Sequence, residues 1–394
     1  MAKFITGLDI GSSRIKVLVA KEGEKNLELV WKYERESEGV RRGVVVDGER
    51  VSEILNEIFS QASRDLKKKI NSVVLGLNGS HLFAIPTKGV ISVSRADQKI
   101  SEEDVQRVLK EAQAINLGTN KEIFDIFPQE FVIDGEGKIK EAVGLKGIKL
   151  EVKALALAGF SPYFENLKKA VLDANLEILD LVFHPLAAAR SCLDERQKEL
   201  GVCLTDFGAG TTSLAVFLEG DLVHLAVLPV GSSNITNDLA IGLKIEPEIA
   251  ERIKLEYGVA FRKGKDEKYK LEIDGEEPLI FSQKILTRII EPRLIEIFNE
   301  VTKELKKIGL EKRLPAGIVL TGGGAKMPRL LELAKKKFSL NCRLGRPKGI
   351  SGIEDDPSLA VVAGLVLAGT DFGEEVSKIG FASKIKRFFK IFLP

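Results

Sequence analysis

Two segments of the sequence combine an aspartate with glycine and hydroxyl side chains in the same order. Residues 8–19 read LDIGSSRIKVLV, and residues 205–216 read TDFGAGTTSLAV. In each segment an apolar run ends at the aspartate, a turn of glycine, serine or threonine follows, and a second apolar run begins. Glycine lets the backbone approach a polyanion with its N–H groups pointing inward, and short hydroxyls add further donors. Each segment is therefore predicted to be a β-hairpin whose turn can hold phosphate groups.

The aspartates of these hairpins, Asp9 and Asp206, suit a divalent cation. Mg²⁺ keeps most of its water and takes few carboxylates, so we expect an ion held largely through water. The two aspartates are 197 residues apart, half the chain length, and a weaker echo pairs SVVLGLNGS (72–80) with GIVLTGGGA (317–325). The repeats indicate two related halves that clamp a triphosphate between them.

A third glycine-rich turn, Gly322 to Gly324, lies between a predicted strand and a predicted helix. It offers bare backbone against which a base or sugar can lie flat. On the predicted helix 248–257, Glu251 and Lys254 stand three residues apart and share one face. Spacing alone favours a surface ion pair for these two side chains over a ligand contact.

The elements that must position these residues alternate between strand and helix patterns, which indicates an α/β fold. Helices are predicted after the N-cap Ser101, from the cap Ser161-Pro162 to about Asp173, over 186–193, from Pro247 to the closing Gly258, and over 325–338. Pro292 interrupts the run 282–307, which is one kinked helix or two. Residues 262–277 read as a surface hairpin. The apolar run 359–369 reads as a buried helix, because it has about half of the ~20 residues that span a bilayer.

Composition excludes several protein classes. The 394 residues are 44% hydrophobic and 29% charged, which suits two or more globular domains and excludes wholesale disorder. A net charge of +2 argues against a nucleic-acid binder. The three scattered cysteines are predicted to be buried, reduced thiols, as expected in a reducing compartment. The three isolated histidines argue against a histidine metal site. No signal peptide is expected, since the first residues run directly into a strand pattern with an acid at position nine.

The final segment, 381–394, reads FASKIKRFFKIFLP and contains no acid. Wound as a helix, it gathers Phe381, Ile385, Phe388, Phe389 and Phe392 on one face, with Lys386, Arg387 and Lys390 opposite and Lys384 at the border. Its length of roughly 20 Å is short of a ~30 Å hydrocarbon core, so the helix is predicted to lie in a membrane interface. The alternative is a terminal helix docked on its own protein.

Together these segments resemble the actin-like nucleotide-binding superfamily and, more narrowly, the FtsA family of bacterial cell-division proteins. The hairpins indicate the superfamily, whereas FPQEFVID (127–134), ITNDLAIGL (235–243) and LPAGIVLTGGG (314–324) are more specific. The resemblance covers nearly the whole chain and implies two lobes of duplicated ribonuclease H-like domains around a nucleotide cleft. It divides the chain into a first lobe core (1–83 and 162–195) with a small subdomain (84–161), a second lobe core (196–227 and 302–370) with its own small subdomain (228–301), a linker (371–380) and the membrane helix (381–394).

The resemblance also implies ATP and Mg²⁺ as ligands, with Asp9 and Asp206 near the metal. It assigns to the phosphates Gly11, Ser12, Ser13, Lys16, Gly208, Gly210, Thr211 and Thr212. It assigns to the ribose and base Glu251 and Lys254, and to the adenosine side Gly322, Gly323, Gly324 and Lys326. For Glu251 and Lys254 this favours a ligand role over the surface ion pair.

Two departures from the superfamily pattern bear on ATP hydrolysis. His184 stands where many members carry a carboxylate before the Pro-x-Ala-Ala stretch, and Ser213 stands where an acid often follows the second hairpin turn. His184 could act as a general base, which needs hydrogen-bond reach of the attacking water, or it is an ordinary half-buried histidine. We expect tight nucleotide binding with slow or no hydrolysis.

The partners that the resemblance implies are further copies of the chain, an anionic membrane, and the tubulin-like FtsZ. It implies that the protein polymerises, tethers FtsZ filaments to the cytoplasmic side of the cell membrane at the division site, and helps to recruit later division proteins. Arg293 and Glu296 are the implied contacts for the FtsZ C-terminal peptide, with plain helix surface as the alternative. Other readings are an actin-like type IV pilus assembly protein, which should lack FPQEFVID and the basic tail, and a small-molecule kinase, for which no catalytic aspartate is found.

Overall fold

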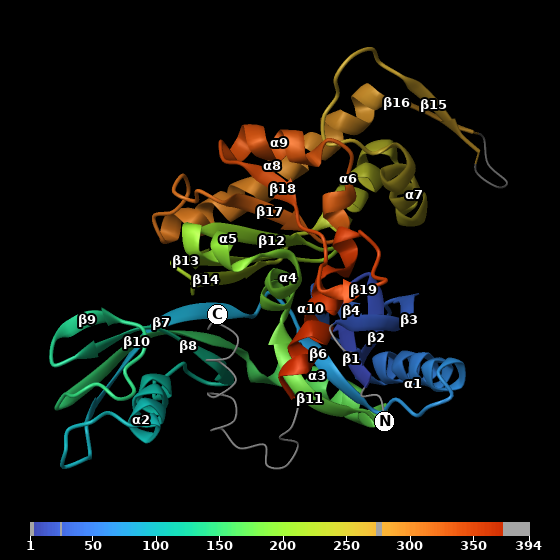
Figure 1. The fold of residues 1–394 in the computed structure, drawn as a ribbon. Helices are drawn as coiled ribbons and strands as arrows, with labels where there is room; N and C mark the ends of the chain where they lie inside the picture. The colour runs from blue at the N-terminus through green and yellow to red at the C-terminus, as the bar shows by residue number, and fades with distance from the viewer. Residues whose placement is uncertain (1–3, 24–25, 273–277, 373–394) are drawn as a thin grey trace.

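The computed structural model describes residues 4–23, 26–272 and 278–372. Two large mixed sheets with helices packed on them form two lobes (Figure 1). The sheet of the first lobe has six strands in the order β11 (Glu177–Phe183), β6 (Ser72–Leu77), β1 (Phe4–Ile10), β2 (Arg14–Glu22), β3 (Leu27–Glu36) and β19 (Ile350–Ser351). This architecture confirms the predicted α/β fold.

The second sheet has nine strands and runs from the second lobe into the segment inserted in the first. Its order is β18 (Cys342–Leu344), β17 (Gly317–Thr321), β12 (Val202–Phe207), β13 (Thr212–Leu218), β14 (Asp221–Leu228), β7 (Phe83–Ser92), β10 (Lys149–Phe160), β8 (Lys121–Ile133) and β9 (Glu136–Ile139). A single residue pair, Ala226 with Phe83, joins β14 to β7. The inserted strands β7 to β10 therefore extend the sheet of the other lobe.

The two halves repeat one arrangement of strands. In the first, β1 pairs antiparallel with β2 and parallel with β6; in the second, β12 pairs antiparallel with β13 and parallel with β17. Both predicted hairpins and the weaker echo thus occupy equivalent positions, which confirms the duplication.

Helices cover both sheets and also join the lobes. The first lobe carries α1 (Gly48–Asp65), α3 (Ser161–Asp173) and α4 (His184–Cys192), while α2 (Glu102–Gln113) packs on the inserted strands and the short β4 (Val40–Arg41) and β5 (Val44–Val45) precede α1. The apolar helix α10 (Ala360–Ala368) is buried except at Leu367. A side chain at Gly364 would place Cβ 1.7 Å from the Ala187 carbonyl oxygen, so glycine is needed where α10 crosses α4. None of the helices in the described ranges combines the length and apolar character needed to cross a bilayer.

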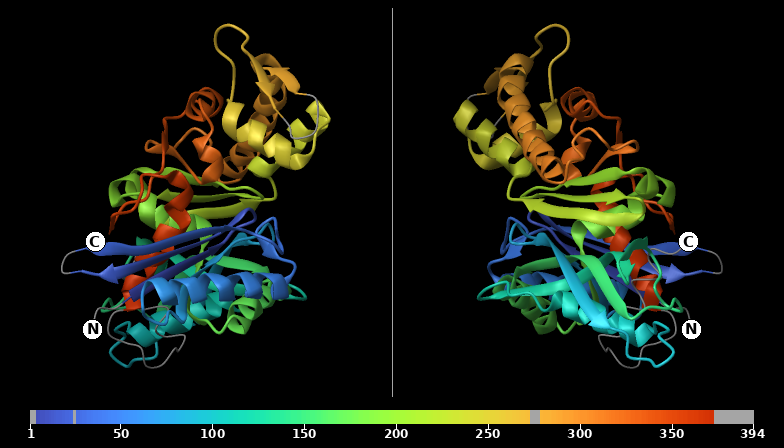
Figure 2. Two further views of the ribbon diagram at one scale, coloured as in Figure 1. Left: turned by 90° about the vertical axis from the view of Figure 1, so that its right-hand side faces the viewer. Right: turned by 90° about the vertical axis from the view of Figure 1, so that its left-hand side faces the viewer.

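The far end of the second lobe is helical (Figure 2). It contains α6 (Ser232–Leu243), α7 (Pro247–Tyr257), the hairpin β15 (Lys268–Leu271) and β16 (Leu279–Ser282), and α8 (Gln283–Lys307). The second lobe also carries α5 (Glu195–Leu200), α9 (Leu330–Phe338) and two short 3-10 helices, η1 (Gly323–Lys326) and η2 (Pro357–Leu359). A third, η3 (Gly369–Phe372), follows α10 and packs on the first lobe, where Gly369 meets Ile5.

Several local predictions are confirmed and others need correction. Ser101 caps α2 with a full capping box, and Pro247 opens α7, which Gly258 closes. Pro292 lies within one continuous helix, α8. The helix expected from residue 325 begins only at Leu330, because Gly323–Lys326 form the 3-10 helix η1 and Arg329 has a left-handed backbone (φ 66°). The cap of α3 is Phe160 and not Ser161.

Two further predictions concern the cysteines and the tail. Cys192, Cys203 and Cys342 are all free and buried, as expected. The predicted membrane helix, 381–394, lies outside the described residues, as does most of the linker before it.

Candidate nucleotide site

The turns of the two hairpins have the same internal hydrogen bond. The Gly11 N–H donates to the Arg14 carbonyl at 3.1 Å, and the Gly208 N–H donates to the Thr211 carbonyl at 3.0 Å. A Cβ at Gly11 or Gly208 would come within 2.8 or 3.0 Å of that same carbonyl oxygen. Both turns therefore need glycine at their first position, and the strands on either side are buried and hold them in place.

These turns, one from each lobe, lie against each other. A Cβ at Gly210 would lie 2.6 Å from Ser12 Oγ, which itself accepts a hydrogen bond from the Gly43 N–H at 2.8 Å. Next to this contact, Asn78 Nδ2 donates to Thr211 Oγ1 at 3.0 Å. Thr212, also predicted at the phosphates, donates its hydroxyl to the Val230 carbonyl at 2.8 Å. The structure thus brings the two predicted phosphate loops together, and Ser13 stands exposed at the tip of the first.

Both aspartates are buried at the ends of their strands, with exposed fractions of 6% for Asp9 and 7% for Asp206. His184, the first residue of α4, is buried as well, and its Nε2 lies 3.3 Å from Asp9 Oδ1 without the geometry of a hydrogen bond. The half-buried histidine expected at position 184 is thus a fully buried one. Burial raises the pKa of the Asp206 carboxyl; His184 and Lys16 lower it, and Asp9 raises it further.

Buried polar atoms without partners gather around these aspartates. Asp9 Oδ1, Asn78 Oδ1 and His184 Nε2 have no hydrogen-bond partner among the residues described. Two of these atoms are oxygens, which is the ligand type that Mg²⁺ takes directly or through water. No cluster of three or more His, Cys, Asp or Glu side chains in the described part of the chain is arranged to hold a metal ion. The residues therefore fit a cation that takes its remaining ligands from water and phosphate.

The third glycine turn packs directly on the second aspartate. Gly322 has a positive φ of 86°, and a Cβ there would lie 2.4 Å from Asp206 Oδ1. A Cβ at Gly324 would meet the Phe207 ring at 2.6 Å, whereas Gly323 has no atom within 4 Å of its Cβ position. Gly323 therefore presents open backbone, and its place on the adenosine side stays a prediction.

The predicted lysines near these turns have protein partners. Lys16 Nζ donates to the Ser358 carbonyl at 2.6 Å and so links the first hairpin to η2. Lys326 Nζ pairs with Asp356 at 2.6 Å. Both ammonium groups border the site and are held by oxygens of the segment 356–358.

Glu251 and Lys254 form the ion pair that their spacing favoured, at 2.6 Å, but only half of it is at the surface, since 42% of the Glu251 side chain is exposed whereas Lys254 is buried. Lys254 is 7% exposed, and its Nζ also donates to Thr236 Oγ1 at 2.9 Å. The Ser232 N–H, at the start of α6, donates to the Gly208 carbonyl at 2.9 Å. The pair thus lies between α6 and α7, one turn of helix from the second phosphate loop.

Arg293 and Glu296 lie on α8, and no contact joins them to the three turns. The Arg293 guanidinium pairs with both carboxylate oxygens of Asp238 at 2.6 and 2.9 Å and with Glu296 at 2.7 Å.

Asn78 was missed by sequence reasoning, although its segment was noted as the weaker echo. The sequence clue to its role was that Asn78 comes directly after β6, the strand that pairs with β1.

Comparisons with known proteins agree with this architecture. The family described as "Cell division protein FtsA" matches residues 203–364, and the "SHS2 domain inserted in FTSA" matches residues 79–158. The cell division protein FtsA of Pseudomonas aeruginosa is 35% identical over 93% of this chain and 89% of its own length. The Bacillus subtilis protein of that name is 34% identical over 95% and 85%, and the Escherichia coli one is 32% identical over 98% and 94%.

Solved structures show the same fold at lower identity. A "PilM-PilN type IV pilus biogenesis complex" chain has a TM-score of 0.68 and 19% identity over 93% of this chain and 98% of its own. MreB5 of Spiroplasma citri, bound to ADP, has a TM-score of 0.55 and 14% identity over 98% of both chains. The fold is thus actin-like. Since curated relatives above 30% identity span nearly its whole length, the chain belongs to the FtsA family of cell-division proteins.

Proposed function

We propose that this division protein binds ATP with Mg²⁺ between its lobes, polymerises in that state, and tethers FtsZ filaments to the cytoplasmic face of the membrane. The observation that carries the proposal is the contact of two equivalent glycine turns beside two buried aspartates, in a chain of the FtsA family. We also propose the division into lobe cores and subdomains that the resemblance implies, with the correction that β19 and α10, within 302–370, pack on the first lobe.

The phosphates would lie along the backbone of both turns, against the N–H groups of Ser12 and Gly210, since those of Gly11 and Gly208 close the turns. Bound Mg²⁺ would neutralise phosphate charge. Asp9 and Asp206 would hold it through water, which also relieves the cost of burying two like charges. That MreB5, with this fold, was solved with ADP supports the same use of the cleft.

The adenosine would lie between Gly322–Gly324 and the Glu251–Lys254 pair. Hydrolysis would be slow, because positions 184 and 213 hold the buried side chains His184 and Ser213 instead of a solvated carboxylate that could activate water. His184 is the proposed base. Its Nε2 is unpartnered, but it is buried beside Asp9 and must reach a water to act.

Membrane attachment would come from the basic tail, 381–394. Each cation near an anionic leaflet contributes about 1 kcal/mol, so four contribute roughly 4 kcal/mol, to which the burial of phenylalanine adds. Ordering the helix offsets part of that gain, so one tail binds reversibly. Several tails on one polymer would bind far more firmly through their effective concentration.

FtsZ would bind at the helical end of the second lobe. Arg293 is already held by Asp238, so the more exposed Glu296, with 56% of its side chain accessible, is the more available of the two proposed contacts. Later division proteins would be recruited to the same membrane-bound polymer.

The test is recruitment of FtsZ to anionic vesicles. FtsZ filaments should pellet with phosphatidylglycerol-containing vesicles when the full chain and ATP–Mg²⁺ are present, and a chain carrying F388S and F389S should leave FtsZ in the supernatant. FtsZ that pellets equally with both chains, or with neither, would contradict the tether.

A further inference from the structure

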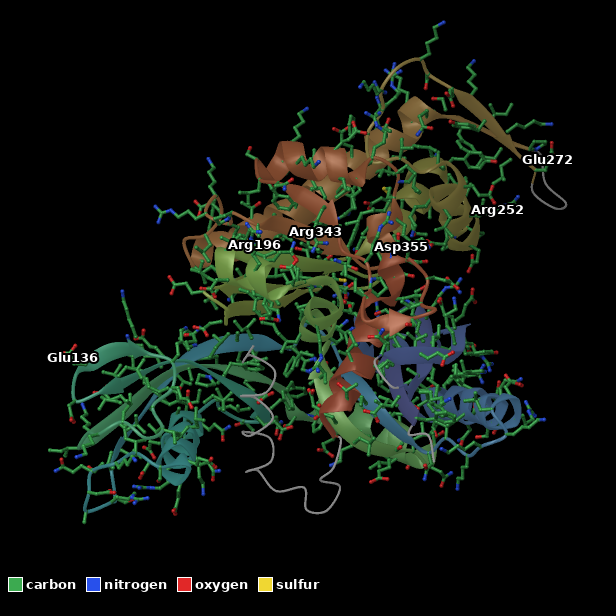
Figure 3. All side chains as sticks on the ribbon, in the orientation of Figure 1. Glu136, Arg196, Arg252, Glu272, Arg343 and Asp355 are labelled. Carbon is green, nitrogen blue, oxygen red and sulfur yellow. The ribbon has the colours of Figure 1, made fainter. Side chains whose placement is uncertain are left out.

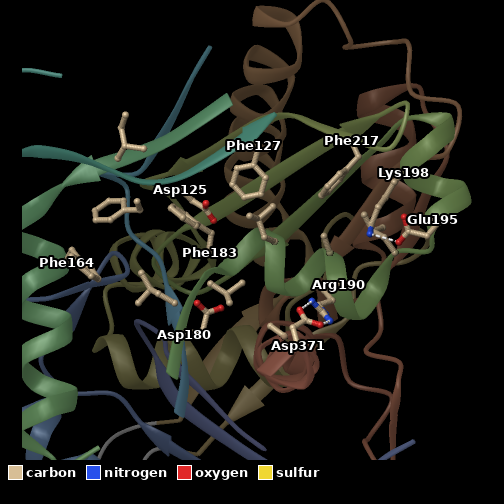
Figure 4. Close-up of a pocket in the computed structure, with 18 of the residues that line it drawn as sticks. Asp125, Phe127, Phe164, Asp180, Phe183, Arg190, Glu195, Lys198, Phe217 and Asp371 are labelled. Atoms are coloured by element: carbon tan, nitrogen blue, oxygen red, sulfur yellow. Dashed lines mark hydrogen bonds and ion pairs between the residues drawn. The ribbon is translucent and has the colours of Figure 1, made fainter. Parts of the chain in front are cut away.

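A cavity lies away from the proposed nucleotide site, where the first lobe, the inserted strands and the second lobe meet (Figure 4). Its volume is about 480 Å³, within the range of roughly 300–1,000 Å³ that ligand pockets occupy. It is bordered by β8, β11, α4, α5, β13 and the end of α10. Five aromatic side chains line it: Phe124, Phe127, Phe164, Phe183 and Phe217.

Acidic groups outnumber basic ones around this aromatic cavity. Its lining holds two cations, Arg190 and Lys198, against five carboxylates: Glu122, Asp125, Asp180, Glu195 and Asp371. Both cations already bind carboxylates, since Arg190 pairs with Asp371 at 2.6 and 2.8 Å and Lys198 pairs with Glu195 at 2.8 Å. The Oε1 atom of Glu122 is buried and has no hydrogen-bond partner within the described ranges. Burial raises the pKa of this carboxyl, and a cation beside it would relieve that cost. The cavity therefore suits an occupant that is both aromatic and positively charged.

The chain itself supplies such an occupant at the edge of the cavity. Ala368 and Asp371 line the cavity, and the described chain ends at residue 372. The ion pair of Arg190 with Asp371 fixes the point from which the remaining 22 residues leave. The eight residues 373–380 reach at most about 26 Å when extended, so the segment 381–394 begins within reach of the cavity. A tether this short gives an effective concentration in the millimolar range.

We propose that the segment 381–394 docks its phenylalanines in this cavity when the protein is off the membrane, with its cations beside the cavity's carboxylates. The segment carries four phenylalanines and four cations and no acid, which complements the lining. The inference rests on the proposed membrane role, because the same apolar face serves both the cavity and the lipid. Docking and membrane binding therefore exclude each other.

Docking would set a threshold for membrane attachment. A tail that is docked nine-tenths of the time is available one-tenth of the time, so its apparent affinity for lipid is about tenfold weaker. A monomer would then stay off the membrane, while a polymer with many tails would overcome the penalty through avidity.

The test compares full-length chains by hydrogen–deuterium exchange and by sedimentation with vesicles of phosphatidylglycerol and phosphatidylcholine, without nucleotide. E122K reverses a carboxylate in the cavity. E136K makes the same charge change on β9, at the far tip of the inserted strands (Figure 3), and is the matched control. F388S/F389S removes apolar groups from the tail. Circular dichroism verifies that each variant is folded.

Docking predicts that amides of residues 122–127 exchange at least about threefold faster in E122K and in F388S/F389S than in wild type or E136K. Vesicles should accelerate the same amides in wild type. E122K should bind vesicles up to about tenfold more tightly than E136K, if the docked fraction is nine-tenths. Equal exchange in all four chains, or protection of these amides that does not depend on the tail, overturns the docking.

Failure of the docking and failure of the membrane role give different results. If the amides respond to F388S/F389S but no chain pellets with vesicles, the tail docks and the proposed tether is wrong. If wild type, E122K and E136K pellet equally and their exchange is equal, the tether stands and the docking is wrong.

Discussion

Replacing Gly210 with alanine should separate the two phosphate turns and weaken ATP binding. The new Cβ would lie 2.6 Å from Ser12 Oγ, whereas ordinary contacts begin near 3.4 Å, so the turns must part by roughly 0.8 Å. Rotation of Ser12 alone cannot relieve this, since the Cβ would also lie 2.9 Å from Ser12 Cβ and 3.1 Å from the Arg42 backbone.

A shift of that size lengthens at least one hydrogen bond from a turn amide to phosphate. Hydrogen bonds to charged groups contribute about 1.5–3 kcal/mol, so losing one raises the Kd for ATP roughly 10- to 150-fold. Overall stability should change less, because the clash lies between two lobes that can move apart.

The assay is calorimetric titration of ATP–Mg²⁺ into G210A, with G48A as the matched control. A Cβ at Gly48 makes only an ordinary contact, 3.8 Å from Ala170 Cβ. G48A should bind ATP as wild type does. A folded G210A that binds ATP within about twofold of wild type would refute the clamp between the two turns.

Three further predictions concern charged groups. Burial raises the pKa of Asp206, so its contribution to stability is present below the ordinary value of 3.8 and is lost as the pH rises through the raised folded value. In urea unfolding of the nucleotide-free protein, D206N should therefore raise the free energy of unfolding at neutral pH but not near pH 3. The same substitution should weaken Mg²⁺-dependent ATP binding. K254M should lower the affinities for ATP and ADP by the same factor in competition titrations, because Lys254 lies on the proposed adenosine side; a loss confined to ATP would place it at the γ-phosphate instead. R293A should lower the free energy of unfolding in urea by about 1–2 kcal/mol, because it removes the guanidinium that bonds both carboxylate oxygens of Asp238 on α6. E296A should change the free energy of unfolding by less than about 0.5 kcal/mol. Equal effects of the two substitutions would contradict this account of α8.

The parts of the fold that were predictable are those with strong local signals. The hairpins, the duplicated Asp-x-Gly turns, the capping box at Ser101 and the opening Pro247 all depend on residues close in sequence. The start of α9 was misplaced because Arg329 adopts a left-handed conformation, which is uncommon for a residue other than glycine and which its sequence does not indicate. Spacing placed Glu251 and Lys254 on one face of a helix but could not tell that Lys254 is buried while Glu251 stays partly exposed.

Contacts between residues far apart in the chain could not be predicted from the sequence. Nothing local indicates that Gly210 meets Ser12, or that the pair Ala226–Phe83 joins two subdomains into one sheet. The aromatic cavity is assembled from segments between residues 122 and 371, and its acidic character appears only when they come together. Asn78 shows the intermediate case, since its segment was noticed but its bond to Thr211 was not foreseen.

The central claim is that ATP held between the lobes controls attachment of the tail to membrane. We would measure sedimentation of the full chain with anionic vesicles, with and without ATP–Mg²⁺, beside G210A and F388S/F389S. The account predicts that wild type pellets more with ATP, that G210A loses this increase at ATP concentrations that saturate wild type, and that F388S/F389S does not pellet in either condition. Pelleting of wild type that is independent of ATP, or pelleting of F388S/F389S equal to that of wild type, would contradict it.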